Sequence, residues 1–334
     1  MFKDIKQVMK DSVLYGIGNV AVKLVGFILI PLYTDAEYFS TADYGLMGLL
    51  EVTSQILIAV MGLSLYSGLI RWYWDAEYRD KQKTIFFTTL LFTILTSLCI
   101  GSVLWLNVGE LSALLVQQEG YSLGGELPYI LQLLILTSML GAVVEVPQNL
   151  LRLQRKPIYY SLTNIVRLFV TLVLTIYFTI SLHRGVSGVY EAQLVGIVIQ
   201  LLMVLPLVIK NSSCRVDRKC TIQLLAYSYP LVFPAIVGSL LTVFDRYIIN
   251  HFQGLDDVGF YSLGYKVGNT LKVFIVTSVQ LALTPLLMKK MNDPDNKQFY
   301  SKVLTYFSFG LMFCALGLNL FSREGIVWVT TNPD

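Results

Sequence analysis

Residues 12–34 decide the class of fold, and they read SVLYGIGNVAVKLVGFILIPLYT. A helix needs about 20 predominantly apolar residues to cross the hydrocarbon core of a bilayer, and this run is long enough. It is too long for the apolar part of a cleavable signal peptide, and no small-residue cleavage site follows it. We therefore expect it to be retained as a first transmembrane helix.

Eight further apolar runs follow at short intervals. Together the runs predict nine transmembrane helices, at residues 12–34, 44–70, 84–106, 129–151, 159–181, 188–209, 221–250, 258–287 and 303–321. The composition agrees, because 55% of the 334 residues are hydrophobic and only 14% are charged, against about 25% charged in an average soluble domain. Pro230 and Pro234 fall inside the seventh predicted helix and predict a kink or an unwound turn there.

The distribution of basic residues predicts the orientation of the chain. If the N-terminus is cytoplasmic, the segments on that side of the membrane hold 18 of the 25 Lys and Arg residues, and the segments on the other side hold 2. Short cytoplasmic loops of membrane proteins carry this excess of positive charge. We therefore expect a multi-pass membrane protein with a cytoplasmic N-terminus.

The chain contains a weak internal repeat with an offset of 214 residues, in which Asp43-Tyr44-Gly45-Leu46 corresponds to Asp257-Val258-Gly259-Phe260. An offset of six helices gives two halves with the same orientation, as in transporters built from parallel repeats. We expect an all-α, two-lobe helical bundle. Residues 1–210 would form an N-terminal lobe of six transmembrane helices. Residues 211–334 would form about three helices of a C-terminal lobe that is truncated.

Several motifs resemble the polysaccharide-transporter family. They are PLYT at residues 31–34, DYG at 43–45, LRLQRK at 151–156, FDRYII at 244–249, and EGIVW at 324–328 leading into TNP at 331–333. That family includes the Wzx-type O-antigen flippases and belongs to the multidrug/oligosaccharidyl-lipid/polysaccharide (MOP) exporter superfamily, which has a MATE-like fold. The resemblance covers the whole chain.

The resemblance implies a transporter and not an enzyme. Its cargo would be an undecaprenyl-diphosphate-linked oligosaccharide, the repeat unit of the O-antigen of lipopolysaccharide or of a capsular or exopolysaccharide. Alternating access would carry it from the inner to the outer leaflet of the bacterial inner membrane. The implied partners are this lipid-linked oligosaccharide diphosphate, membrane lipids, and polysaccharide polymerase and assembly proteins. The alternative is an exporter of other cargo on the same fold, either a drug/cation antiporter or a peptidoglycan-precursor flippase.

Other classes of protein find little support. A net charge of +3 gives no argument for nucleic acid as a partner, and no G-x-x-x-x-G-K-[ST] motif for ATP is present. The four cysteines and two histidines lack the spacing of metal sites, so we expect no metal and no cofactor. The longest predicted loop, residues 107–128, holds only three glutamates as candidate catalytic groups.

Ionisable side chains inside the predicted helices mark a candidate transport site, because each costs about 2.5–3.5 kcal/mol at the centre of a membrane helix. Cations offset the desolvation of a diphosphate and bond its oxygens, and five are candidates for this role: Lys23, Arg246, Lys266, Lys272 and Arg167. Three acids are candidates to pair with these cations or to exchange protons or sodium: Glu51, Glu145 and Asp245.

Helical spacing places most of these charges on polar stripes, which predict a central hydrophilic cavity between the lobes. It also places Lys266 and Lys272 on different faces of one helix. The competing interpretation is that the same residues form structural ion pairs that fix helix register.

Overall fold

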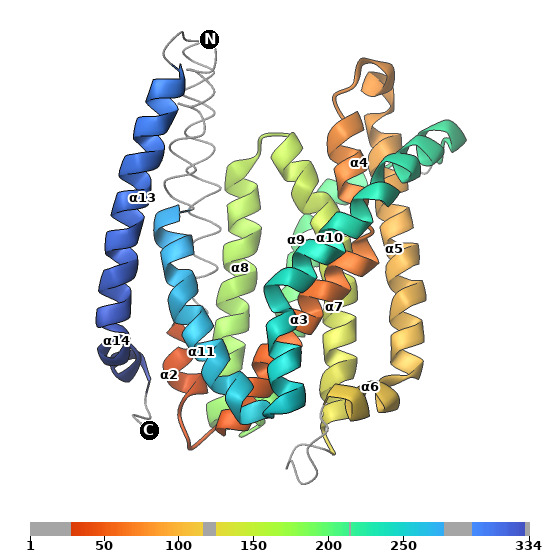
Figure 1. Cartoon of the computed structure of the whole chain (residues 1–334). Coiled ribbons are helices and arrows are strands. Elements are labelled where there is room, and N and C mark those ends of the chain that lie inside the picture. The colour runs from red at the N-terminus through yellow and green to blue at the C-terminus, as the bar shows by residue number, and fades with distance from the viewer. Residues whose placement is uncertain (1–27, 116–124, 214, 277–295, 331–334) are drawn as a thin grey trace.

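The computed structural model describes residues 28–115, 125–213, 215–276 and 296–330, and within these ranges the chain is an α-helical bundle without β-strands (Figure 1). Seven helices in the described ranges are long and apolar enough to cross a membrane. They are, or lie largely within, α3 (Thr41–Gly62), α5 (Gln82–Leu106), α7 (Leu127–Leu153), α8 (Pro157–Ile176), α9 (Gly185–Asn211), α10 (Arg218–Phe252) and α13 (Asn296–Leu320).

Shorter elements complete the described bundle: α2 (Ile30–Tyr33), α4 (Leu65–Trp72), α6 (Val108–Leu115), α11 (Leu255–Leu271) and α14 (Ser322–Val329). A π-helical turn at Lys272–Val276 continues α11. The first and eighth predicted spans lie only partly within the described residues, where they correspond to α2 and α11. The chain thus has the multi-pass helical architecture that its hydropathy predicts.

The second predicted span, residues 44–70, is wrong as a single helix. The chain forms α3 and α4 instead, and between them Leu63 and Ser64 take left-handed conformations with φ of 43° and 51°. Such a conformation costs roughly 1–2 kcal/mol for an L-residue, so neighbouring helices must stabilise it. The Thr96 hydroxyl of α5 donates to the Met61 carbonyl at 2.8 Å, and the Ser64 hydroxyl donates to the Leu231 carbonyl at 3.4 Å.

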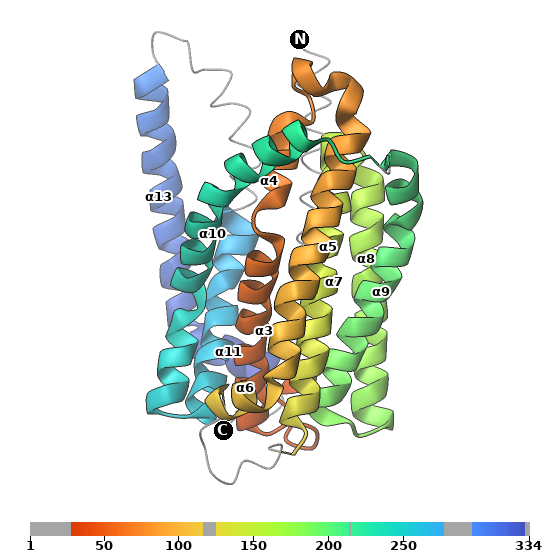
Figure 2. The ribbon, with the colours of Figure 1, turned by 90° about the vertical axis from the view of Figure 1, so that its right-hand side faces the viewer.

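Of the kink or unwound turn expected at Pro230 and Pro234, the structure shows no unwinding. The 35 residues of α10 form one continuous helix through both prolines. The helix changes direction along its length, running obliquely across the bundle (Figures 1 and 2). Each proline removes a single amide donor, and here the chain accommodates the loss by bending and not by unwinding.

Two clusters of buried apolar side chains hold the bundle together. One joins α3 to α7, α9 and α11 and includes Leu46, Leu50, Ile130, Tyr190 and Leu255. The other joins α4 to α5, α7 and α10 and includes Leu69, Phe86, Leu150 and Leu224. Because lipid tails are as apolar as these side chains, close van der Waals packing and interhelical hydrogen bonds carry the association. The first cluster contains α3 and the second contains α4, so these two consecutive helices connect the clusters.

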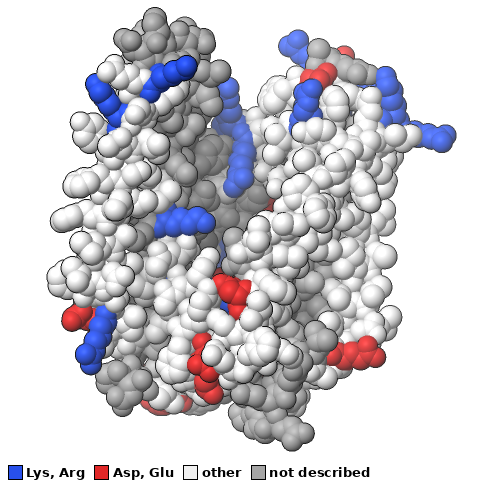
Figure 3. All heavy atoms as spheres, viewed as in Figure 1, with Lys and Arg blue, Asp and Glu red and all other residues white. Residues whose placement is uncertain are grey.

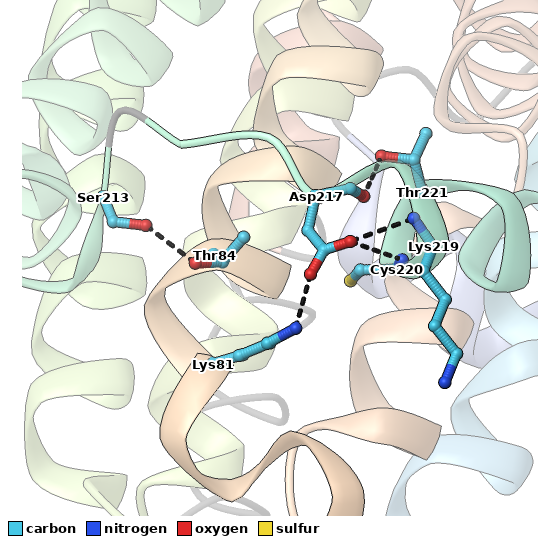
Figure 4. A network of polar contacts seen from close by, with 7 residues as sticks. All are labelled: Lys81, Thr84, Ser213, Asp217, Lys219, Cys220 and Thr221. Atoms are coloured by element: carbon cyan, nitrogen blue, oxygen red, sulfur yellow. Dashed lines mark hydrogen bonds and ion pairs between the residues drawn. The ribbon is translucent and has the colours of Figure 1, made fainter.

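The two ends of the bundle differ in charge. Lys and Arg side chains gather at the upper end in Figure 3, and most of the visible Asp and Glu side chains lie lower. We call the upper end the basic end. There the connection from α9 to α10 is fixed to α5, because Lys81 Nζ lies 2.5 Å from the Asp217 carboxylate and the hydroxyls of Thr84 and Ser213 are 3.1 Å apart (Figure 4). Asp217 also caps α10 by accepting from the backbone N–H groups of Lys219 and Cys220.

Candidate transport site

A cavity of about 440 Å³ lies among α2, α3, α8, α9 and α11. Among the described residues three charged side chains line it, and each comes from a different helix: Glu51 from α3, Arg167 from α8 and Lys266 from α11. The structure therefore brings together three of the eight side chains that the sequence singled out. Figure 3 shows the bundle hollowed on the face between α13 and α10, with basic side chains along the upper part of the hollow.

Arg167 is held by a ladder of amide side chains. Its guanidinium donates to Gln200 Oε1 at 3.1 Å, and Gln200 Nε2 donates to Asn164 Oδ1 at 3.1 Å. Asn164 in turn lies 3.5 Å from the side-chain oxygen of Gln148 on α7. Gln200 is only 1% exposed, so this support is internal to the bundle. The ladder fixes the half-buried guanidinium at the wall of the cavity.

Lys266 reaches the cavity from α11 and lies against two aromatic rings. Its Nζ atom is 5.0 Å from the ring centroid of Tyr44 and 5.9 Å from that of Tyr33. A cation at this distance from an aromatic face is attracted by the ring quadrupole, and more strongly where water is excluded. The aromatic rings thus help to hold a positive charge inside the bundle.

Glu51 supplies the negative charge of the cavity, and uncharged polar groups surround it. The polar neighbours in the lining include Ser54, Gln55, Thr171, Gln193 and Ser262. They come from α3, α8, α9 and α11, so the polar stripes predicted on several helices do converge on one space. Such a lining can hydrate or bind a charged group at a depth where lipid could not.

Arg246 and Asp245 lie one layer behind the cavity. Arg246 is 7% exposed, donates from Nε to Ser262 Oγ at 3.2 Å, and lies 4.7 Å from the ring centroid of Tyr265. The Asp245 carboxylate accepts from the Tyr261 hydroxyl. These contacts join α10 to α11. Ser262 lines the cavity, so Arg246 touches a residue of the cavity wall without lining the cavity itself.

The other predicted side chains are not part of this cavity. Glu145 on α7 and Lys272 at the end of α11 are both exposed outside its lining. Lys266 and Lys272 therefore do face different surroundings, as helical spacing predicted. Lys23 lies outside the described residues. Within the described part of the chain, no group of three His, Cys, Asp or Glu side chains could hold a metal ion.

Sequence comparison now assigns the family. A family model described as "Polysaccharide biosynthesis protein" matches residues 8–291. The chain belongs to this family. No curated protein is similar enough in sequence to count as a match.

Comparison with solved structures identifies the fold of this chain. The MATE multidrug transporter DinF-BH, solved in complex with a ligand, matches 97% of this chain and 78% of its own, at 15% identity and a TM-score of 0.69. An inward-facing MATE family transporter of the MOP superfamily matches 95% of this chain and 72% of its own, at 14% identity and a TM-score of 0.67. A MOP superfamily transporter from Pyrococcus furiosus, described as having a binding pocket of reverse polarity, matches 97% of this chain and 74% of its own, at 15% identity and a TM-score of 0.65. The chain thus has the fold of the MATE transporters of the MOP superfamily.

Proposed function

We propose that this protein moves an undecaprenyl-diphosphate-linked oligosaccharide from the inner to the outer leaflet of the bacterial inner membrane. The observation that carries the proposal is the placement of Arg167 and Lys266 around one cavity inside the helical bundle. The membership of the polysaccharide biosynthesis family supports the class of cargo.

The physical need is to move a diphosphate through a region of low dielectric constant. A guanidinium bonds phosphate oxygens in a bidentate fork, and an ammonium acts as a compact point charge. Two cations and one carboxylate line the cavity among the described residues, which leaves a net positive charge for an anionic headgroup. The amide ladder behind Arg167 keeps its guanidinium oriented before the ligand arrives.

The helices that carry the two cations suggest how the cycle proceeds. Arg167 belongs to the expected N-terminal lobe and Lys266 to the expected C-terminal lobe, so rocking of the lobes would change the distance between them. At the end opposite the basic end, α3 and α11 pack tightly through Gly45 and Gly259. In our proposal the basic end faces the cytoplasm, and lipid enters there while the far end is closed.

A second function is favoured by Glu51. A carboxylate in the cavity could bind a cationic drug or exchange a proton, and two of the three solved structures compared above are described as multidrug transporters. Under this function Glu51 is the essential group and the two cations are dispensable. A peptidoglycan-precursor flippase would share the diphosphate chemistry and differ only in the sugar.

Transport into proteoliposomes separates these functions. The chain is reconstituted with undecaprenyl-diphosphate-linked oligosaccharide, and a membrane-impermeant lectin reports the leaflet of the sugar. We expect Arg167→Ala and Lys266→Ala each to lower the rate at least about tenfold, as the loss of a charge-assisted hydrogen bond does. Arg71→Ala, a change of an exposed cation at the basic end, is the matched control. Export of a cationic dye is measured in parallel. The second function would be established instead if Arg167→Ala and Lys266→Ala transported the lipid at the wild-type rate while Glu51→Gln no longer exported the dye.

A further inference from the structure

A second cavity of about 570 Å³ lies at the end of the bundle opposite the basic end. Its walls are the connection from α2 to α3, the start of α11, and the end of α14 with Thr330 directly after it. Aromatic side chains dominate the lining: Tyr33, Tyr38, Phe39, Tyr44 and Phe260. We call this space the aromatic vestibule. Its volume is within the range of roughly 300–1,000 Å³ that small-molecule sites occupy.

The aromatic vestibule adjoins the charged cavity. Tyr33 and Tyr44 line both spaces, so the two spaces meet at these side chains. On the side of the charged cavity the Lys266 ammonium lies 5.0 Å from the ring centroid of Tyr44. A ligand with a diphosphate at Lys266 would therefore have its next chemical group within reach of the vestibule.

The charge of the lining excludes a second phosphate site. Among the described residues of the vestibule, Glu37 is the one charged side chain, and no cation accompanies it there. A carboxylate would repel a phosphate, whereas it accepts hydrogen bonds from hydroxyl groups. The lining therefore suits a neutral, polyhydroxylated ligand.

The walls of the vestibule are fixed by local contacts. Ser40 and Asp43 form a reciprocal capping box at the start of α3, at 3.1 and 2.9 Å. The ring of Tyr38 stacks with His183 from the connection before α9, and the ring of Tyr33 packs edge-on to Phe39. The rings of Tyr33, Tyr38 and Phe39 are therefore held in place before a ligand binds, which lowers the entropic cost of binding.

We propose that the aromatic vestibule binds sugar rings of the lipid-linked oligosaccharide while its diphosphate lies between Arg167 and Lys266. Sugar rings present apolar C–H faces that pack on aromatic rings, and hydroxyls that donate to an acceptor such as the exposed Glu37 carboxylate. The inference rests on the proposed function and adds a specificity site to it. Selection among sugars then resides at Tyr38 and Phe260, away from the charged cavity.

Binding of two lipids to the purified chain in nanodiscs, measured by native mass spectrometry, tests this site. The probes are undecaprenyl diphosphate without sugar and the lipid-linked oligosaccharide extracted from cells that make it. We expect the wild-type chain to bind the sugar-bearing lipid about tenfold more tightly. Phe260 is 59% exposed, so Phe260→Ala removes no core packing. This variant should bring the ratio of the two affinities toward one. Phe260→Tyr, which keeps the ring, should retain the preference.

The outcomes for the vestibule and for the proposed function are separable. Arg167→Ala should weaken the binding of both lipids equally and leave the ratio of their affinities unchanged. Equal affinity of the wild-type chain for the two lipids, or an undiminished preference in both Phe260→Ala and Tyr38→Ala, would overturn the vestibule and leave the flippase function standing. Binding of neither lipid by the wild-type chain would overturn both.

Discussion

Gly45 on α3 and Gly259 on α11 make a reciprocal contact in which neither residue has room for a side chain. A Cβ atom on Gly45 would lie 1.9 Å from the Leu255 carbonyl oxygen, and a Cβ atom on Gly259 would lie 2.6 Å from the Thr41 carbonyl oxygen. Thr41 and Leu255 are separated by the same 214 residues as Gly45 and Gly259. Contacts that reciprocate in this way arise across a two-fold axis. The contact therefore supports the repeat that the sequence predicts.

The first prediction concerns the stability of this contact. Gly45→Ala forces α3 and α11 apart, since the nearest atoms to the new methyl group are backbone and cannot turn away. Overpacking of this kind typically costs about 1–3 kcal/mol, so the melting temperature in detergent should fall. Gly109→Ala on α6 is the control, because a Cβ atom there meets nothing within 4 Å. Equal melting temperatures for the two variants would contradict the close approach.

The helices were predictable because their signal is local. A run of apolar residues must be a helix in a bilayer, since only a helix satisfies its own backbone hydrogen bonds. The break at Leu63 and Ser64 was not predictable on this basis. Neither residue favours a left-handed conformation, and the groups that stabilise the break, Thr96 and Leu231, come from helices distant in the sequence.

The charged residues were predictable as a set but not as an arrangement. The cost of burying a charge singles out Arg246 as well as Arg167, yet the rotation of each helix decides which of them lines the cavity. Packing of α10 on α11 turns Arg246 toward Ser262 and Tyr265. Gln200 carries no charge, so the cost of burying charge did not single it out. An amide side chain within the apolar sequence of α9 was the feature that could have indicated it.

The second prediction tests the break between α3 and α4. Thr96→Val removes the hydroxyl that bonds the Met61 carbonyl and leaves this buried oxygen without its interhelical donor. An unmade buried hydrogen bond costs about 1–3 kcal/mol. Thr89→Val is the matched control on the same helix, because the Thr89 hydroxyl bonds the Ile85 carbonyl one turn away. Unfolding in denaturant should show that Thr96→Val lowers the free energy of unfolding clearly more than Thr89→Val does. Equal decreases would mean that the break between α3 and α4 does not need this hydrogen bond.

The third prediction concerns the link between α9 and α10. The hydrogen bond from Lys81, and then that from the Lys219 backbone, lower the pKa of Asp217 below its ordinary value. A carboxyl whose pKa is lower in the folded chain adds stability above its unfolded pKa and loses it as pH falls through the lowered value. The difference in melting temperature between wild type and Lys81→Gln should therefore be present at pH 7 and vanish in acid.

Two variants of Asp217 separate its ion pair from its capping role. Asp217→Asn keeps an N-cap acceptor for the Lys219 and Cys220 amides, whereas Asp217→Ala loses both roles. We expect Asp217→Ala to lower the melting temperature at pH 7 more than Asp217→Asn does. A gap between wild type and Lys81→Gln that persists in acid would show that the ion pair is not its cause.

The last prediction concerns Gln200 as the residue that positions Arg167. Gln200→Leu keeps the volume of the side chain but removes the acceptor of Arg167 and the donor to Asn164. The loss of two buried partners should lower stability by about 1–3 kcal/mol and weaken the binding of undecaprenyl diphosphate. Gln193→Leu, on the same helix and also lining the cavity, is the control that leaves the ladder intact.

Gln200→Glu distinguishes positioning from folding. A carboxylate at position 200 loses the donor to Asn164 but keeps an acceptor for the guanidinium, so it should cost less stability than Gln200→Leu, and it would also neutralise the charge that a diphosphate needs. We therefore expect a smaller loss of stability than in Gln200→Leu, while undecaprenyl diphosphate binds at least about tenfold more weakly. Wild-type affinity in Gln200→Glu would mean that the Arg167 guanidinium does not bind the diphosphate, and Lys266 would then be the cation that holds the headgroup.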